Sequence, residues 1–292
     1  MVYGTSFRDR LETFLIYLGL AIFATIAVLP FIHTIARSFS AEAPILRSEV
    51  HVWPVSPTLD AYTRLLSSTA FWRGFWNSIV ITGVGTAVMM CVTVLAAYPL
   101  SRPNLPGRGF LMLLIIFQMI FPPGLIPFYL TVKQSGLMDS YWAVIIPYAI
   151  NAFYLIVLIN YFRNLPVEME ESAIVDGAND LQVLWDIMLP LSMPVLMTLT
   201  LFYAVQQWNM YLPAIFFIND GNLQPLQVVL RDMIWSLQLM TQTASADQFE
   251  RAAGLEALKA GSVIVAALPM IALYPFIQRF FIKGIVLGAI KQ

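Results

Sequence analysis

The chain has 292 residues, of which 59% are apolar and 11% are charged. Soluble globular proteins carry about 25% charged residues, so this composition excludes an ordinary soluble domain. The formal net charge of -1 gives no basic field, which excludes a typical nucleic-acid binder. One cysteine, Cys91, cannot form an intrachain disulfide, and two histidines, His33 and His51, are too few for a metal site. No metal or cofactor is expected.

Six apolar stretches are long enough to cross about 30 Å of hydrocarbon as helices, and none of their cores contains Asp or Glu. We therefore expect an all-α, polytopic membrane protein that forms a single domain over residues 1–292. The spans are predicted at about 14–36, 78–98, 110–130, 141–160, 191–217 and 261–282. The third contains Pro122, Pro123 and Gly124, and such breaks survive at membrane depth only beside other protein or a water-lined cavity. The pattern indicates a bundle with an interior path.

The first apolar stretch could also be a cleaved signal peptide, because Arg8 and Arg10 precede it and Ala41-Glu42-Ala43 resembles a cleavage site. Its apolar run of about 22 residues exceeds the roughly 7–15 of a signal peptide, so we expect a retained span. Lys and Arg are shared evenly between the two sides of the membrane, so charge orients the chain only weakly. An even number of spans puts both termini on one side.

The segment 161–190, between the fourth and fifth spans, predicts two short helices. Pro166 suits the first helical position, and Gly177 suits the left-handed residue that ends a helix. Asn179 or Asp180 can cap a second helix. One apolar face is then expected from the spacing i, i+3, i+4 and i+7, at Leu181, Leu184, Trp185 and Met188.

Part of this segment follows the pattern E-A-A-x-x-D-G-A and then I-x-L-P. The matching positions are Glu171, Ser172, Ala173, Asp176, Gly177, Ala178, Ile187, Leu189 and Pro190. They closely resemble the EAA loop of binding-protein-dependent ABC importer permeases, with Ser172 where alanine is usual. The resemblance implies the type I importer permease fold. It also implies that 161–190 is a cytoplasmic coupling loop seated on a separate ATPase, and that both termini are cytoplasmic.

Further stretches narrow the resemblance to the carbohydrate branch of the family, and to the second of two unlike permeases. They include residues 97–102, Trp208-Asn209 and Pro225-Leu226-Gln227. The resemblance implies a bacterial inner-membrane importer of oligosaccharides cut from polysaccharides such as alginate or rhamnogalacturonan. Its expected partners are a second homologous permease in a heterodimer, two copies of an ATP-binding subunit, an external sugar-binding protein and membrane lipid. The outer loops, 37–77 and 218–259, would then lie on the side of the binding protein.

Polar side chains near the middle of the fifth span indicate either a substrate path or hydrogen bonds between helices. Trp and Tyr offer flat faces to a sugar ring, and amides offer donors and acceptors to hydroxyl groups. The path residues expected on this basis are Gln206, Gln207, Trp208, Asn209 and Tyr211, with Gln118 and Asn151 on neighbouring spans.

Three other classes of membrane protein fit less well. An ion-coupled secondary transporter usually needs ionisable residues within its spans, and these spans offer no carboxylate. An intramembrane enzyme would need paired carboxylates, a histidine cluster or a triad, and a structural scaffold leaves the 161–190 loop unexplained. The chain also lacks G-x-x-x-x-G-K-[ST]. The sequence therefore favours a non-catalytic permease subunit whose ATP hydrolysis occurs in a partner.

Overall fold

The computed structural model describes residues 7–243 and 254–289. Within these ranges the regular elements are helices, with one isolated antiparallel bridge between Ser40 and Pro57. The expected all-α class is confirmed.

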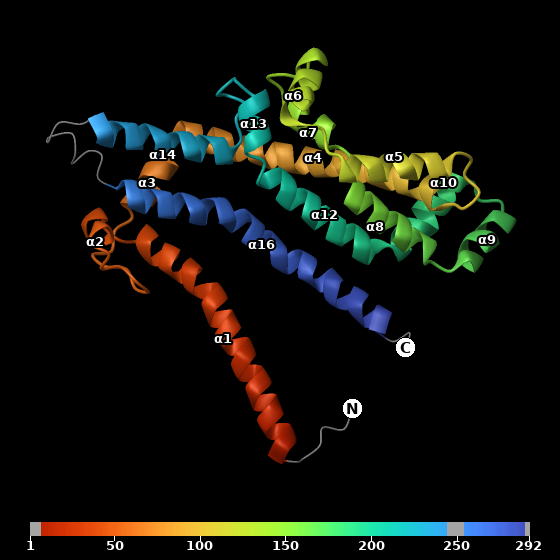
Figure 1. Cartoon of the computed structure of the whole chain (residues 1–292), viewed down its shortest axis with the longest axis horizontal. Coiled ribbons are helices and arrows are strands. Elements are labelled where there is room, and N and C mark those ends of the chain that lie inside the picture. Colours follow the sequence, from red (N-terminus) through yellow and green to blue (C-terminus); the bar gives the residue numbers. More distant parts are fainter. Residues whose placement is uncertain (1–6, 244–253, 290–292) are drawn as a thin grey trace. The chain divides into compact units, whose positions relative to one another are not determined.

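The chain divides into two compact units: unit 1 is Met1–Thr69 with Leu230–Leu268, and unit 2 is Ala70–Val229 with Pro269–Gln292. The α-helices, traced in Figure 1, are α1 (Phe7–Ser38), α2 (Glu42–Leu46), α3 (Asp60–Ser67), α4 (Thr69–Ser101), α5 (Arg108–Ile120), α6 (Leu125–Gln134), α7 (Trp142–Ile145), α8 (Ala152–Arg163), α9 (Val167–Val175), α10 (Asp180–Gln182), α11 (Leu189–Leu191), α12 (Met193–Trp208), α13 (Leu212–Phe217), α14 (Leu226–Thr243) and α16 (Leu255–Ala289). A 3-10 turn, η1 (Ile146–Tyr148), follows α7, and a π-helix, η2 (Val183–Met188), joins α10 to α11.

Three of the described helices are long and apolar enough to cross a membrane on their own: α1, α4 and the first part of α16. Three bent pairs qualify as spans when each pair is taken together. They are α5 with α6, bent by 119°, the Trp142–Tyr148 helix with α8, bent by 49°, and the Asp180–Leu191 helix with α12, bent by 84°.

The predicted fifth span, 191–217, is not one continuous helix. Helix α12 ends at Trp208, Asn209 occupies its C-cap, and a separate helix, α13, begins at Leu212. Pro213, which has no backbone N–H to donate, stands in the first turn of α13, the position where a helix tolerates proline.

Unit 1 joins the end of α1, helix α2 and the start of α16. The two carboxylate oxygens of Glu42 accept the backbone N–H groups of Glu256 at 3.1 Å and Ala257 at 3.2 Å, which satisfies donors left free at the start of α16. Glu256 in turn pairs with Arg37 at 2.8 Å and Lys259 at 2.7 Å. A small apolar core lies beside these contacts, made of Ala36, Ile45, Val50, Ala61 and Ala257.

Within the described residues of unit 2, two apolar cores can be traced. The first lies where the end of α4 meets α8, η2 and α12, and includes Leu158, Leu184 and Leu199, each almost fully buried. The second joins α4 at Ile81 to α7 and α13, and includes Phe217. In Figure 1, α9 and α10 lie at the end of unit 2 where α5 begins, whereas α6 lies beside α13 in the part formed by the second core.

Two glycines let α4 pack closely within unit 2. A Cβ atom on Gly74 would lie 2.8 Å from a methyl carbon of Val229, and one on Gly85 would lie 2.8 Å from Nε2 of Gln207. Small residues at helix contacts are the usual means of close packing among membrane helices. Gly74 therefore lets α4 lie against the start of α14, and Gly85 makes room for the side chain of Gln207 at the end of α12.

The sharpest bend, between α5 and α6, contains residues 121–124. Pro122 and Pro123 cannot continue the N–H···O=C ladder, and the residue before a proline is pushed out of helical geometry. Phe121 accordingly has φ -117 and ψ 73, and Gly124 occupies the N-cap of α6.

Candidate functional site

Helix α9 is the first helix that lies wholly within the predicted coupling segment, which we call the 161–190 loop. Pro166 is its N-cap, with φ -59 and ψ 122, so the helix begins one residue later than the sequence predicts. Glu168 and Glu170 lie in its first turn, where the positive end of the helix dipole favours carboxylates.

The end of α9 is a tight cap around Gly177. The N–H of Gly177 donates to the carbonyl of Ile174 at 3.0 Å, and the N–H of Ala178 donates to that of Ala173 at 2.9 Å. These two bonds form the Schellman motif, in which the residue that follows the C-cap adopts a left-handed conformation. Gly177 has φ +90, so the predicted left-handed cap is confirmed.

Asn179 caps the next helix, α10, at once. Its side-chain oxygen accepts the N–H of Gln182 at 3.0 Å, and the Gln182 side-chain oxygen accepts the N–H of Asn179 at 2.9 Å. This reciprocal arrangement is a capping box. Of the two caps that the sequence left open, Asn179 rather than Asp180 is therefore the one used.

The expected apolar face of the second helix is wrong. Leu184 and Met188 are buried, but Leu181 and Trp185 are 62% and 61% exposed, and Val183 is buried instead. The cause is the π-helix η2, whose hydrogen bonds run from i to i+5. The wider turn brings Val183 and Leu184 over Met188 and leaves Leu181 and Trp185 on the opposite face.

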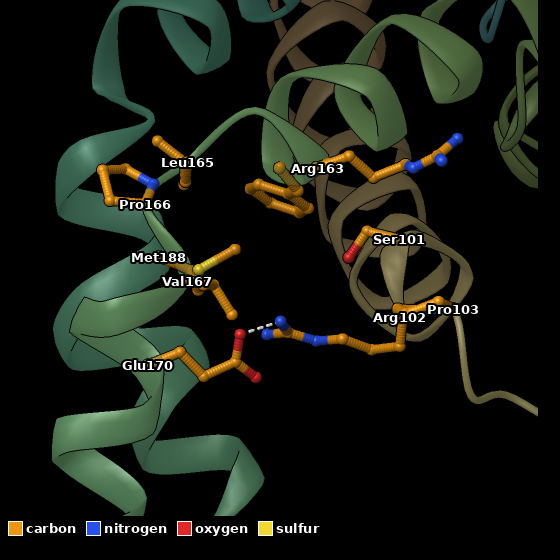
Figure 2. Close-up of a pocket in the computed structure, with 10 residues that line it drawn as sticks. Ser101, Arg102, Pro103, Arg163, Leu165, Pro166, Val167, Glu170 and Met188 are labelled. Atoms are coloured by element: carbon orange, nitrogen blue, oxygen red, sulfur yellow. Dashed lines mark hydrogen bonds and ion pairs between the residues drawn. The ribbon is translucent and has the colours of Figure 1, made fainter.

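The 161–190 loop is attached to the end of α4 by an ion pair between Arg102 and Glu170, drawn as a dashed line in Figure 2. The side chains are 27% and 14% exposed, and the Arg102 guanidinium also lies 4.5 Å from the centre of the Tyr98 ring. The pair lies in a cleft of about 290 Å³, from which the guanidinium of Arg163 points away. The cleft is lined by Ser101, Arg102, Pro103, Phe162, Arg163, Leu165, Pro166, Val167, Glu170 and Met188.

Neither Arg102 nor Glu170 belongs to the predicted site. Nothing in the sequence links two positions that are 68 residues apart. The signals that could have found them are indirect. Arg102 closes the family-like stretch 97–102, and Glu170 is one of three acidic residues near the start of α9.

The predicted coupling residues divide into an outer and an inner set. Ala173, Ala178 and Leu189 are partly buried and pack against the first core of unit 2. The remaining members are exposed: Glu171, Ser172, Asp176, Gly177 and Pro190. The outer set is accompanied by exposed apolar side chains on the same loop, among them Ile174 at 51%, Val175 at 86% and Trp185.

The structure places three predicted path residues in one cleft of unit 2, of about 420 Å³. Gln118 comes from α5, Asn151 from the N-cap of α8 and Gln206 from α12. The full lining is Gln118, Pro123, Leu125, Phe128, Pro147, Tyr148, Ile150, Asn151 and Gln206.

The other four predicted path residues lie elsewhere, because successive residues of a helix point in different directions. Gln207 is 2% exposed and its Nε2 faces Met89 Sδ and the Val144 carbonyl, both at 3.4 Å. Trp208 is also buried and meets Phe75 edge-on. Asn209 is the exposed C-cap of α12. Tyr211 packs against the second core of unit 2.

A second connection, the 219–226 loop before α14, is fastened to other elements by side chains. Asn77 on α4 is 3% exposed, and its Nδ2 donates to the carbonyls of Asn222 at 2.8 Å and Gln224 at 2.9 Å. Its Oδ1 accepts the hydroxyl of Tyr141 at 2.8 Å, and Ser78 Oγ accepts the N–H of Leu226 at 2.8 Å.

Asp139, between α6 and α7, holds the start of the same loop. Its N–H donates to the Phe217 carbonyl at 2.9 Å, and its carboxylate accepts the N–H groups of Asn219 and Asp220. The residue has φ +56, a left-handed geometry that aspartate tolerates better than most residues. The Asn219 backbone N–H, then the Asn219 side chain and the Asp220 N–H, lower the pKa of the Asp139 carboxyl below its usual 3.8.

Comparison with known proteins gives consistent results. Residues 89–286 match the family model described as the binding-protein-dependent transport system inner membrane component. The chain is 43% identical to the polygalacturonan/rhamnogalacturonan transport system permease protein YtcP of Bacillus subtilis (strain 168), over 97% of this chain and 99% of that protein. It is 45% identical to protein LplC of the same organism, over 91% and 90% of the two chains.

Solved structures give the same family. A chain of a bacterial ABC transporter involved in the import of the acidic polysaccharide alginate superposes with a TM-score of 0.83 at 32% identity, over 95% of this chain and 99% of that one. A chain from the bacterial alginate ABC transporter in complex with an alginate pentasaccharide-bound periplasmic protein has a TM-score of 0.57 at 16% identity, a likeness of fold alone. The present chain belongs to the family of binding-protein-dependent transport system inner membrane components and is a multi-pass permease of that family.

Proposed function

We propose that this chain is the permease subunit of an ATP-driven importer, and that it passes a saccharide delivered by an external binding protein. Relatives named for rhamnogalacturonan and alginate transport support the saccharide class. The proposed assembly is a heterodimer with a second homologous permease, carrying two copies of an ATP-binding subunit in which hydrolysis occurs. The 161–190 loop would face the ATPase, with both termini on the same cytoplasmic side.

The observation that carries this proposal is the construction of the 161–190 loop. Helix α9 is closed at its end by its own cap and exposes Ile174 and Val175, and η2 exposes Trp185; a partner protein would cover these apolar side chains. Ala173 on the inner face of α9 and Ala178 just after its cap rest on the core shared by α4, α8 and α12. A displacement of α9 by a bound ATPase would therefore be conveyed to three helices of unit 2.

Gly177→Val tests this coupling role, with Gly136→Val as its matched control. Both glycines have positive φ, +90 and +68, and in the described part of the chain nothing lies within 4 Å of either Cβ position. A branched residue costs about 1–2 kcal/mol at such a position, so the two variants carry similar backbone strain. Gly177→Val should lose co-purifying ATPase and substrate-stimulated ATP hydrolysis in liposomes, while Gly136→Val keeps both. Equal behaviour of the two variants would show that the 161–190 loop is not the coupling element.

The orientation can be tested by cysteine labelling. In a Cys91→Ala background, single cysteines replace Ser172 on α9 and Gly221 in the 219–226 loop, both exposed positions. A membrane-impermeant thiol reagent applied to intact cells should label position 221 and spare position 172 until the membrane is opened. The opposite pattern would put the 161–190 loop outside and remove it from any contact with an ATPase.

A further inference from the structure

The cleft between α5, α6, η1, α8 and α12 has the size and lining of a small-molecule site. Its volume of about 420 Å³ falls within the range of roughly 300–1,000 Å³ typical of such sites. Two aromatic rings form part of the wall, Phe128 from α6 and Tyr148 from η1, with centroids 5.5 Å apart and planes at 70°. Edge-to-face packing of this kind is a favoured arrangement of aromatic pairs, and both rings border the cleft.

Three amide side chains complete the wall, from three different helices: Gln118, Asn151 and Gln206. The Asn151 oxygen accepts the N–H groups of Phe153 at 3.0 Å and Tyr154 at 3.2 Å, which fixes the side chain and leaves its NH₂ group for a ligand. Polar groups within apolar stretches are costly against lipid, so they face protein or solute. Amides beside aromatic faces match the alternating hydroxyl and C–H surfaces of a pyranose ring.

The lining also has a distinctive charge character. None of the described residues that line the cleft is Asp, Glu, Lys, Arg or His. A carboxylate that enters such a site loses water without gaining a cationic partner, which makes its transfer unfavourable. A hydroxyl group meets no such penalty, because Asn151 can donate to it and Gln118 and Gln206 can both donate and accept.

From the convergence of Gln118, Asn151 and Gln206 with Phe128 and Tyr148, we propose that this cleft is a saccharide subsite for an uncharged pyranose ring. The proposal rests on the permease function proposed above and adds the class of sugar unit that this subunit contacts. A uronate unit of an acidic oligosaccharide would have its carboxylate recognised elsewhere in the transporter, and this cleft would take a neutral unit of the chain.

Solute protection tests the subsite on the assembled transporter in lipid nanodiscs, without the need to know the natural substrate. In a Cys91→Ala background, Gln206→Cys on α12 and Gln118→Cys on α5 each place a thiol in the lining, and Gly221→Cys, at an exposed position of the 219–226 loop, is the control. The rate of thiol labelling is measured with and without neutral trisaccharides, and with uronate trisaccharides at the same concentration. Neutral trisaccharides should slow labelling at positions 206 and 118 at least threefold, uronates should have less effect, and position 221 should be unaffected.

The other outcomes separate the two proposals. Equal or stronger protection by uronates would overturn the neutral-ring assignment. Protection by neither class, or no labelling at either position, would show that another protein segment fills the cleft or that it is closed. In both cases the subsite is rejected, while saccharide uptake that still depends on this chain in cells would leave the permease function standing. Loss of that dependence for every saccharide in the panel would reject the permease function itself.

Discussion

Two connections in unit 2 are stabilised in different ways. The 161–190 loop is held in shape by its own helix caps, at Gly177 and Asn179, and is tied to α4 by the Arg102–Glu170 ion pair. The 219–226 loop forms no such helix, and side chains from α4 and from the α6–α7 connection fasten it, chiefly Asn77 and Asp139. The shape of the 161–190 loop therefore depends mainly on bonds within the loop, whereas that of the 219–226 loop depends on bonds to neighbouring elements.

The difference matters for what each connection can do. A self-capped helix can move as a unit without losing its internal hydrogen bonds, which suits an element that transmits a displacement. A loop whose carbonyl groups are held by Asn77 cannot leave α4 without breaking those bonds. The 161–190 loop is therefore suited to motion, and the 219–226 loop to a fixed position on the end of unit 2 that carries α7 and α13.

The largest effect is expected from Asn77→Ala. The change leaves two carbonyls and the Tyr141 hydroxyl without their partner at a site that is 3% exposed, and each lost partner costs about 1–3 kcal/mol. We expect a loss of about 3 kcal/mol in the free energy of unfolding. Hydrogen exchange should accelerate at residues 222–226 and remain unchanged at 173–178. The exposed Asn104→Ala should change neither measurement, and equal acceleration in both loops would show that the two loops are not stabilised independently.

A smaller loss of stability, confined to the 161–190 loop, is expected from Arg102→Met. It leaves the largely buried Glu170 carboxylate without its cation, at a cost of about 1–2 kcal/mol, between the values for exposed and for buried pairs. Exchange should now accelerate at residues 167–175 only. In a double-mutant cycle, the second change Glu170→Gln should restore most of the loss, since the buried charge is gone. Additive losses would mean that the pair does not hold α9.

The smallest effect concerns acid. The folded-state pKa of Asp139 lies below its usual 3.8, so its contribution to stability is present above about pH 3.8 and is lost as pH falls through the lowered value. Protection of the Asn219 and Asp220 amides, corrected for intrinsic exchange, should therefore fall as the pH is lowered from 5 to 2.5. Asp139→Asn should remove this dependence, and a persistent acid step in the variant would assign it to another group.

Sequence predicts the 161–190 loop well where its structure is local. Gly177 and Asn179 act within four residues of themselves, so the residue type alone indicates the cap. The attachment through Arg102 and Glu170 is tertiary, and no local pattern contains it. The π-helix η2 also escapes prediction, because the expected apolar face assumed 3.6 residues per turn, and it reverses the expected exposure of Leu181 and Trp185.

The polar residues of the predicted fifth span show the same limit. Their composition indicates that the segment is unusual, but four neighbours on a turning backbone cannot share one surface. Gln206 lines the cleft, whereas Gln207 enters the space that Gly85 leaves open on α4. The sequence alone does not distinguish the two glutamines, because their environments depend on how α12 is rotated about its axis.

The π-helix affects where the chain can tolerate the deletion of one residue. Between Val183 and Met188 the helix holds one more residue than an α-helix needs for the same hydrogen-bonded ring. Loss of one residue there can be absorbed by closing the wide turn into an ordinary one, with Asn179 still capping one end and Pro190 still in place at the other. The same deletion in α4 would rotate every later side chain by about 100° and drive Gly85 away from Gln207. The 161–190 loop can therefore tolerate the loss of one residue in η2, whereas α4 cannot tolerate such a loss before Gly85.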